Sequence, residues 1–220
     1  MADMKKIATR DSYGKAITQL GAEHNDIVVM DADLAGSTKS GVFRKEFPNR
    51  HFNCGIPEGN MMAGAAGVAA MGLVPYVSSF AMFAAGRGFE QIRNSIGYPH
   101  LNVKIVASHG GISVGEDGAS HQCCEDFALM RSIPGMVVMC PADDAEAQAA
   151  VRAAYEHNGP VYIRTGRLAV PQFHESVDFG FKIGKGEVLR EGDDIAIIAT
   201  GLMVAEAVAA ADALAEKGIH

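Results

Sequence analysis

The chain has 220 residues, of which 48% are hydrophobic and 20% charged, and its formal net charge is −7. This length suits one sizeable domain plus part of another, and the composition is ordinary for a globular protein. The acidic balance argues against a nucleic-acid binder, which would carry a basic stripe. No apolar stretch reaches membrane-spanning length and no apolar signal region follows the N-terminus, so we expect a cytoplasmic protein without a membrane segment.

Short apolar runs alternate with helical stretches along most of the chain. Buried strands are predicted at 27–34, 74–80, 103–109, 136–140 and 160–164. Helices are predicted around them, at about 11–24, 57–71, 84–97, 122–131 and 143–157. This alternation predicts an α/β fold, a three-layer sandwich with a mostly parallel sheet covered on both faces. Ligands bind such sheets at the carboxyl ends of the strands, so a site is expected in the loops that follow them.

The character of the sequence changes near residue 168. Residues 168–190 contain Pro, Gly and charged residues without a helical period, and predict a linker with a short strand or hairpin. A strand at 194–200 and an Ala-rich helix at 202–217 are predicted next. One strand and one helix cannot bury a core alone. We therefore expect three parts: a domain over 1–170, a linker over 171–190, and the incomplete start of a second α/β domain over 191–220.

Glu58 is the only carboxylate in a stretch of small and apolar residues, 55–72. A glutamate in the first turn of a helix is common, because it interacts favourably with the helix dipole. A helix so poor in polar residues is also expected to be buried, and desolvation lets an acid remain protonated as a donor. The residues alone favour the first interpretation and leave the second open.

Phe80 and Phe83 lie three residues apart where a predicted strand meets a predicted helix. Aromatic residues at this spacing usually belong to a core. They could equally form a wall for a flat heteroaromatic ring.

The most unusual segment, SHGGISVGEDGASHQ at 108–122, follows a buried strand and is rich in glycine. Such a loop can bring its backbone close to a ligand. His109, Asp117 and His121 add one acid and two groups that titrate near neutral pH. Their spacing matches no zinc pattern, so no metal site is predicted in this chain.

Three polar residues at the ends of predicted elements complete the candidates. Arg10 lies near the chain start, Ser37 follows the DADLAG segment, and Arg164 ends the VYIR strand. Each alone is typical of a surface or structural residue. Together with the histidines they could form an anion pocket for a sugar phosphate.

At these residues the sequence resembles the transketolase family. The segments ATR, DADL, GIPEGNM, SFAMFAAGR and ASHGGISVGEDGASHQ occur in the family's order and approximate spacing. The resemblance covers nearly all of the chain and is strongest to the C-terminal section of split transketolases. It implies a pyrimidine-binding domain of a thiamine-diphosphate enzyme, with Glu58 on N1′ of the aminopyrimidine and Phe80 and Phe83 packed on that ring.

The resemblance also implies roles on the substrate side. His121 matches a histidine near the donor hydroxyl groups, and Asp117 matches a residue that reads a substrate hydroxyl. Arg10, Ser37, His109 and Arg164 match the sugar-phosphate pocket, with Arg167 as an alternative to Arg164. Two positions depart from the family: Pro57-Glu58-Gly59 replaces Arg-Glu-His, and Gly86 replaces a further aromatic residue.

The family's GDG…N motif, which holds the metal and the cofactor diphosphate, does not occur in this sequence. The resemblance therefore implies a partner chain, the N-terminal transketolase section, which would hold Mg²⁺ or Ca²⁺ with the diphosphate. A homodimer of this chain and inactivity of the isolated chain are further expectations.

The expected activity is transfer of a two-carbon ketol unit between sugar phosphates, as in the pentose phosphate pathway. Two alternatives remain: another thiamine-diphosphate component (deoxyxylulose-phosphate synthase or a 2-oxo acid dehydrogenase β-subunit), or a non-catalytic assembly subunit. The His-Gln pair at 121–122 favours transketolase over the synthase, and intact Glu58, Asp117 and His121 argue against a non-catalytic subunit.

Overall fold

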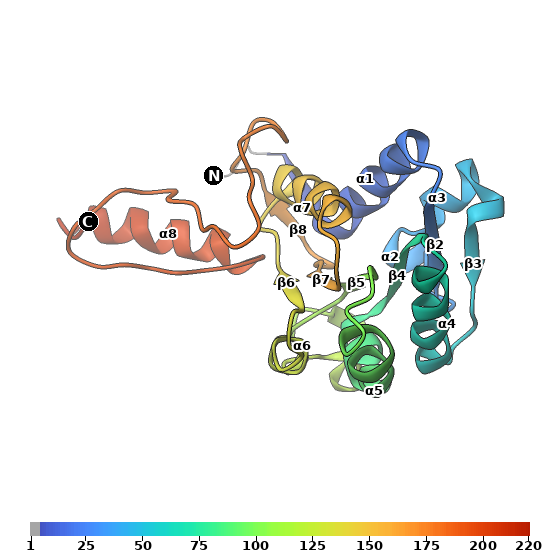
Figure 1. Ribbon diagram of the computed structural model, residues 1–220. Coiled ribbons are helices and arrows are strands. Elements are labelled where there is room, and N and C mark those ends of the chain that lie inside the picture. The colour runs from blue at the N-terminus through green and yellow to red at the C-terminus, as the bar shows by residue number, and fades with distance from the viewer. Residues whose placement is uncertain (1–4) are drawn as a thin grey trace.

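A six-stranded sheet forms the centre of the protein in the computed structural model, which describes residues 5–220 (Figure 1). The strand order is β3-β2-β4-β5-β7-β6, and every neighbouring pair is parallel. The strands are β2 (Ile27–Asp31), β3 (His51–Asn53), β4 (Val74–Phe80), β5 (Lys104–Ser108), β6 (Val137–Met139) and β7 (Val161–Arg164). The central strands β2, β4 and β5 are buried along their whole length, as expected for a sheet with both faces covered.

Helices cover the two faces of the sheet and bury alternate residues of each strand. Val28 and Met30 of β2 pack into one core cluster, while Ile27 and Val29 pack into the other. The first cluster is covered by α4 (Glu58–Ala70), the run η2 (Met82–Arg87), α5 (Phe89–Gln91) and η3 (Ile92–Gly97), and α6 (Asp126–Arg131). The second is covered by α1 (Thr9–Glu23), α3 (Gly41–Glu46) and α7 (Asp144–Glu156). The predicted three-layer α/β fold is thereby confirmed.

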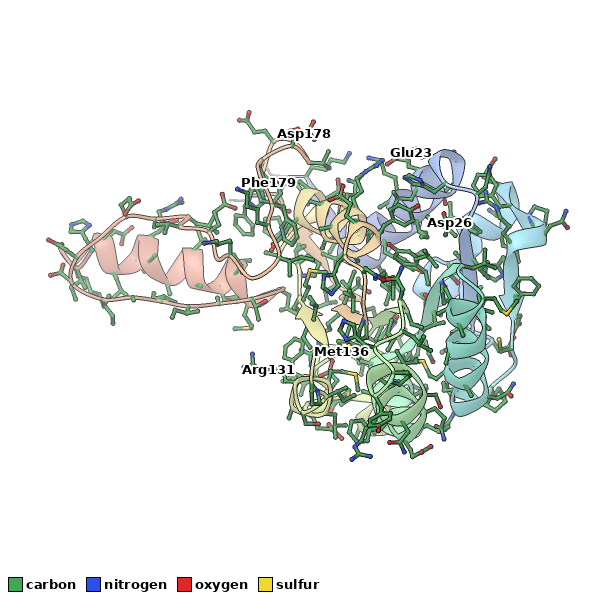
Figure 2. All side chains as sticks on the ribbon, in the orientation of Figure 1. Glu23, Asp26, Arg131, Met136, Asp178 and Phe179 are labelled. Carbon is green, nitrogen blue, oxygen red and sulfur yellow. The ribbon has the colours of Figure 1, made fainter. Side chains whose placement is uncertain are left out.

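Helices α1 and α7 are also joined by polar contacts at their outer ends. Arg152 donates two hydrogen bonds of 2.8 Å to the carboxylate of Glu23, which ends α1. Tyr155 donates to Asp26 at 3.1 Å. Glu23 and Asp26 are labelled in Figure 2, with Glu23 at the upper edge of the view. These contacts tie together two helices that are far apart in the sequence.

A separate two-stranded ribbon closes the domain. β1 (Lys6–Ala8) pairs antiparallel with β8 (Ala169–Pro171), with Ile7 opposite Val170. Short elements connect the rest: α2 (Ala35–Thr38), η1 (Pro48–Arg50), η4 (Gly115–Asp117) and η5 (Ala119–His121).

The last part of the chain forms a lobe that projects from the body, away from α4 (Figure 1). Helix α8 (Met203–Ala215) forms as predicted, and its Val204 and Val208 pack with Ala142. The strand predicted at 194–200 is wrong, because the structure gives this segment no strand. Within residues 5–220 no neighbouring strand offers it a ladder, and a strand needs one to satisfy its backbone groups.

The helix predicted at 122–131 also begins later than expected, at Asp126. Cys123 instead pairs with Gly111 in an isolated antiparallel bridge, with Gly111 N donating to Cys123 O at 2.7 Å. This bridge closes the base of the glycine-rich loop. None of the helices in the described part of the chain is both long and apolar enough to cross a bilayer.

Candidate active site

The carboxyl edge of the sheet brings together side chains from three elements. Glu58 begins α4, Phe80 ends β4, and His109 directly follows Ser108, the last residue of β5. The glycine-rich loop returns His121 to the same place, because its ring meets those of Phe80 and Phe83. These residues come from one edge because parallel strands all end there.

Glu58 is almost completely buried, with 1% of its surface exposed. Its oxygens have one partner each: Ser79 Oγ donates to Oε1 at 3.0 Å, and Arg87 Nη1 donates to Oε2 at 2.5 Å. Ser79 is itself buried on β4, whereas the Arg87 side chain is 49% exposed. Burial of a carboxylate is costly unless it is paired and hydrogen-bonded, and these two donors meet that requirement.

An aromatic wall stands beside Glu58. The rings of Phe80 and Phe83 have centroids 6.0 Å apart and lie within 19° of parallel. The His109 ring stacks on Phe80 at 3.9 Å, and the His121 ring meets Phe83 edge-on at 5.0 Å. The wall therefore presents ring faces and edges, the surfaces against which a flat heteroaromatic group packs.

His109 is held in an unusual backbone conformation, with φ of 60°. A non-glycine residue with positive φ is uncommon, and such strain clusters at functional sites. Its Nδ1 lies 2.9 Å from Ser108 Oγ and its Nε2 lies 3.4 Å from Arg10 Nη1. The contact with an arginine, which can only donate, assigns Nε2 as the acceptor.

The surroundings keep the His109 ring neutral. Burial, followed by the charge of Arg10, lowers the pKa of His109 to about 4, although Asp117 acts in the opposite direction. His109 is therefore a neutral hydrogen-bonding group at physiological pH.

Arg10 and Ser37 meet across the start of α1. Arg10 Nη1 donates to the main-chain oxygen of Ser37 at 3.1 Å. The buried Nε of Arg10 has no hydrogen-bond partner among residues 5–220. A buried guanidinium N–H without a partner is a donor available to a ligand.

The two candidate arginines of β7 and the following turn differ in orientation. Arg164 bonds both oxygens of Asp126, at 2.9 and 2.5 Å, and stands 4.0 Å over the ring of Phe127. Its guanidinium is thus committed to a buried pair. Arg167 instead bonds the exposed Glu116 at 2.5 Å, and its charge contributes to the lowered pKa of His109. Arg167 is thus paired with an exposed residue of the glycine-rich loop rather than with a buried acid.

Glycine is required at Gly110 by the packing of Arg164. A Cβ at this position would lie 2.2 Å from Arg164 Nε. The backbone of the loop at Gly110 therefore packs directly against the side chain of Arg164.

Two contributors to the site were not predicted from the sequence, Ser79 and Arg87. Ser79 is one of two serines that precede Phe80, and nothing in its local sequence marks it. Arg87 lies four residues after Phe83, and its guanidinium carbon stands 4.8 Å from the centre of that ring. The i, i+4 spacing from an aromatic residue in the candidate site was the available signal.

No group of three His, Cys, Asp or Glu side chains in the described part of the chain could hold a metal ion. The carboxyl edge thus contains the buried acid Glu58 beside an aromatic wall, together with several cations, but no metal-binding cluster within residues 5–220.

Comparison with known proteins places this fold and site in a family. The model of the transketolase pyrimidine-binding domain matches residues 5–172, and that of the transketolase C-terminal domain matches residues 184–220. The chain belongs to the transketolase family. Membership implies dependence on thiamine diphosphate.

Split transketolases are among its most similar relatives. A structure described as a split-gene transketolase, inactive β4 tetramer, is 54% identical with a TM-score of 0.89, over 98% of this chain and 70% of that one. The Methanocaldococcus jannaschii protein named "Putative transketolase C-terminal section" is 51% identical over 96% of this chain and 67% of its own length. Pichia stipitis transketolase with sedoheptulose-7-phosphate is 27% identical with a TM-score of 0.85, over 99% of this chain and 34% of that one.

The chain spans about two thirds of the length of the first two curated relatives, 67% and 65%. The second of these is the 6-deoxy-6-sulfo-D-fructose transketolase subunit SqwH of a Clostridium species, 42% identical over 96% of this chain.

Proposed function

We propose that this chain is the pyrimidine-binding component of a thiamine-diphosphate-dependent transketolase, which transfers a two-carbon ketol unit between sugar phosphates. The observation that carries the proposal is the buried carboxylate of Glu58 beside the wall of Phe80 and Phe83. A dry carboxyl group next to ring faces suits a nitrogen heterocycle that must be both stacked and hydrogen-bonded.

The residues present fit the aminopyrimidine half of the cofactor. Glu58 would hold N1′, with Ser79 fixing the carboxylate, and Phe80 and Phe83 would pack against the ring. When bound, the cofactor supplies the thiazolium carbon that takes up the two-carbon unit. The chain's own part is to orient the ring, to exclude water around Glu58 and to hold a proton between Glu58 and N1′.

The substrate side of the site is assigned to the cations and hydroxyl-reading groups. We propose that Arg10, Ser37 and His109 line the phosphate pocket, because the Arg10 Nε is free to bond an anion and His109 orients Arg10. The sequence left Arg164 and Arg167 as alternatives for this pocket. We assign Arg167 to it, since Arg164 is bound to Asp126. His121 and Asp117 would read the hydroxyl groups of the sugar.

The diphosphate and its Mg²⁺ or Ca²⁺ are assigned to a partner chain, the N-terminal transketolase section. Neither the sequence motif nor a cluster of metal ligands is found within residues 5–220 to hold them. The surface of helix α4 supports the assignment of a protein partner. Glu58 is the only charged residue in this helix, and its exposed positions, such as Ala63 and Gly67, are uncharged.

We also propose that this chain associates with itself, and that its parts have the limits 1–170, 171–190 and 191–220.

Glu58→Gln in the enzyme reconstituted with the partner chain and magnesium tests the proposal. Glutamine keeps the size of the side chain and can meet N1′, but it cannot share a proton with it. We expect kcat to fall by roughly 10²–10⁴-fold with a much smaller change in cofactor affinity. Exchange of the thiazolium C2 proton, followed by NMR in deuterated buffer, should slow in parallel.

The matched control is Glu156→Gln, an exposed glutamate at the end of α7 on the other face of the sheet, which should leave both rates unchanged. C2 exchange as fast in Glu58→Gln as in the unmodified enzyme would show that Glu58 only interacts with the helix dipole.

A deoxyxylulose-phosphate synthase activity is the second candidate. A synthase of Desulforudis audaxviator is 37% identical over 98% of this chain. The His121-Gln122 pair favours transketolase, and Gln122 donates to Ile112 O across the glycine-rich loop at 3.2 Å. Failure of the reconstituted enzyme to transfer a ketol unit to any aldose phosphate would favour the synthase.

A further inference from the structure

Arg87 covers the same two groups that the proposed function assigns to the pyrimidine ring. Its Nη1 bonds Oε2 of Glu58 at 2.5 Å, and its guanidinium carbon stands 4.8 Å from the centre of the Phe83 ring. The same Nη1 also reaches Ile56 O at 3.4 Å. The planar guanidinium therefore spans the opening between the acid and the aromatic wall.

A heterocycle cannot use Glu58 and Phe83 while Arg87 holds both. Oε1 of Glu58 faces the buried Ser79, so Oε2, on the side of the half-exposed Arg87, is the oxygen that an incoming N1′ would reach. A stacked ring would need the face of Phe83 over which Arg87 stands, because cation–π contact and ring stacking use the same surface. Arg87 and the ring therefore exclude one another.

Of the two partners of Glu58, only Arg87 can leave without disturbing the core. Ser79 is fully buried on β4, whereas the Arg87 side chain is 49% exposed and ends η2, a turn of π-helix. Such turns occur frequently at functional sites. If Arg87 left with nothing in its place, Glu58 would remain buried without its charged partner, which is unfavourable. Its departure and the arrival of a ring nitrogen are thus coupled.

We propose that Arg87 is a latch on the pyrimidine site: it holds Glu58 and covers Phe83 in the chain alone, and it gives way when the ring binds. This inference rests on the proposed function. Before the cofactor arrives, the latch gives the buried carboxylate of Glu58 a charged partner. It also reduces the affinity of the free chain for the ring.

Thiamine is the probe that tests the latch, because it carries the aminopyrimidine but no diphosphate and so needs no partner chain. Calorimetric titration of the full chain with thiamine should show Arg87→Met binding about tenfold tighter or more than the unmodified chain, since one charged hydrogen bond no longer competes. Arg93→Met is the matched control, because Arg93 is exposed and, among residues 5–220, its side chain bonds only its neighbour Asn94. It should bind thiamine as the unmodified chain does.

A second arm separates the latch from the proposed function. In a Glu58→Gln background, Arg87→Met should raise the affinity for thiamine by much less than tenfold, because Arg87 then has no carboxylate to bind. Circular dichroism checks the fold of each variant, and Arg87→Gln, a shorter polar side chain, serves if Arg87→Met does not fold.

Equal or weaker thiamine binding by both Arg87→Met and Arg87→Gln, while Glu58→Leu, which has no hydrogen-bonding group to meet N1′, impairs binding, would overturn the latch and leave the proposed function standing. Thiamine binding that Glu58→Leu leaves unchanged would overturn the proposed function and the latch together, as would the failure of every form to bind thiamine.

Discussion

Opposite ends of the parallel sheet stabilise a buried charge in different ways. At the amino end of β5, Lys104 is fully buried, and its ammonium donates to three oxygens: Asn102 Oδ1 at 2.5 Å, His157 O at 2.6 Å and Gly159 O at 2.8 Å. At the carboxyl end, Glu58 has one buried partner and one that is half in water. The first arrangement uses all three donors of the side chain within the fold, and the second leaves the carboxylate accessible to a ligand.

Lys104 and Glu58 differ in their partners rather than in their burial. Lys104 has as many acceptors as it has protons, and two of them are backbone oxygens that cannot turn away. Glu58 has spare acceptor capacity and a partner on a flexible side chain. Burial alone does not distinguish the two residues, whereas the number and mobility of their partners do.

The largest stability loss is expected for Lys104→Met. This change removes the side-chain donor to His157 O and to the buried Gly159 O and leaves Asn102 Oδ1 with Gly159 N alone, so we expect the free energy of unfolding to fall by about 3 kcal/mol. Glu58→Gln should cost about 1 kcal/mol, because the amide oxygen can still accept from Arg87 and the amide nitrogen can donate to the hydroxyl of Ser79. Urea unfolding measures both stability losses. It is done at pH 6 because burial lowers the pKa of Lys104 to about 7. A larger loss for Glu58→Gln would break the distinction.

His174 should give an intermediate and pH-dependent effect. It joins the buried Asp143 through Nδ1 at 2.9 Å and Glu187 through Nε2 at 2.8 Å, and it stacks on Phe179, labelled in Figure 2. Burial acts to lower the pKa of His174, but the hydrogen bond to Glu187 and the charge of Asp143 outweigh it and raise the pKa. The protonated ring thus ties the linker to the start of α7.

Because the folded-state pKa is the higher one, this contribution is fully present below the unfolded value of about 6.5 and is lost as pH rises through the folded value. His174→Gln should therefore lower the free energy of unfolding by about 1–2 kcal/mol at pH 6 and by less at pH 8.5. Thermal unfolding at the two pH values measures the difference. A loss that grows with pH would contradict the sign.

The smallest effect is expected for Arg152→Gln. Arg152 and Glu23 form two hydrogen bonds, but their side chains are 36% and 47% exposed. Exposed pairs contribute about 0.2–1 kcal/mol, and salt screens them. Urea unfolding at low and high salt should show a small loss that shrinks with salt. A loss as large as that of Lys104→Met would mean that the number of buried partners does not determine how much stability is lost.

The fold followed from the sequence because its strongest signals are local. Apolar runs such as 27–34 and 74–80 mark strands buried on both faces, and the intervening periodic stretches mark the helices. The strand at 194–200 was wrong for a non-local reason. Its apolar pattern is strand-like, but pairing depends on a neighbour that the pattern of one segment cannot report.

The candidate site was predictable in its residues more than in its contacts. Glu58 stands out as the only carboxylate of its stretch, Phe80 by its place where a strand meets a helix, and His109 by its glycine-rich loop. The direction of a long side chain is decided by tertiary packing, so the sequence could not tell that Arg164 turns to Asp126, or that Arg87 turns to Glu58. Spacing alone does not set the orientation of such flexible side chains.

The ribbon of β1 and β8 has a consequence for how this domain can be built into longer proteins. It places Lys6 opposite Pro171, so the domain is entered and left at one point on its surface. Further polypeptide can therefore be joined before Lys6 or after Pro171 without stretching the central sheet. A match to nearly the whole chain makes up 34% of the length of mouse transketolase-like protein 2 and 67% of that of the Methanocaldococcus jannaschii protein, so the same architecture occurs in polypeptides of very different length. Gene fusion and gene fission can act on such a module without redesign of its core.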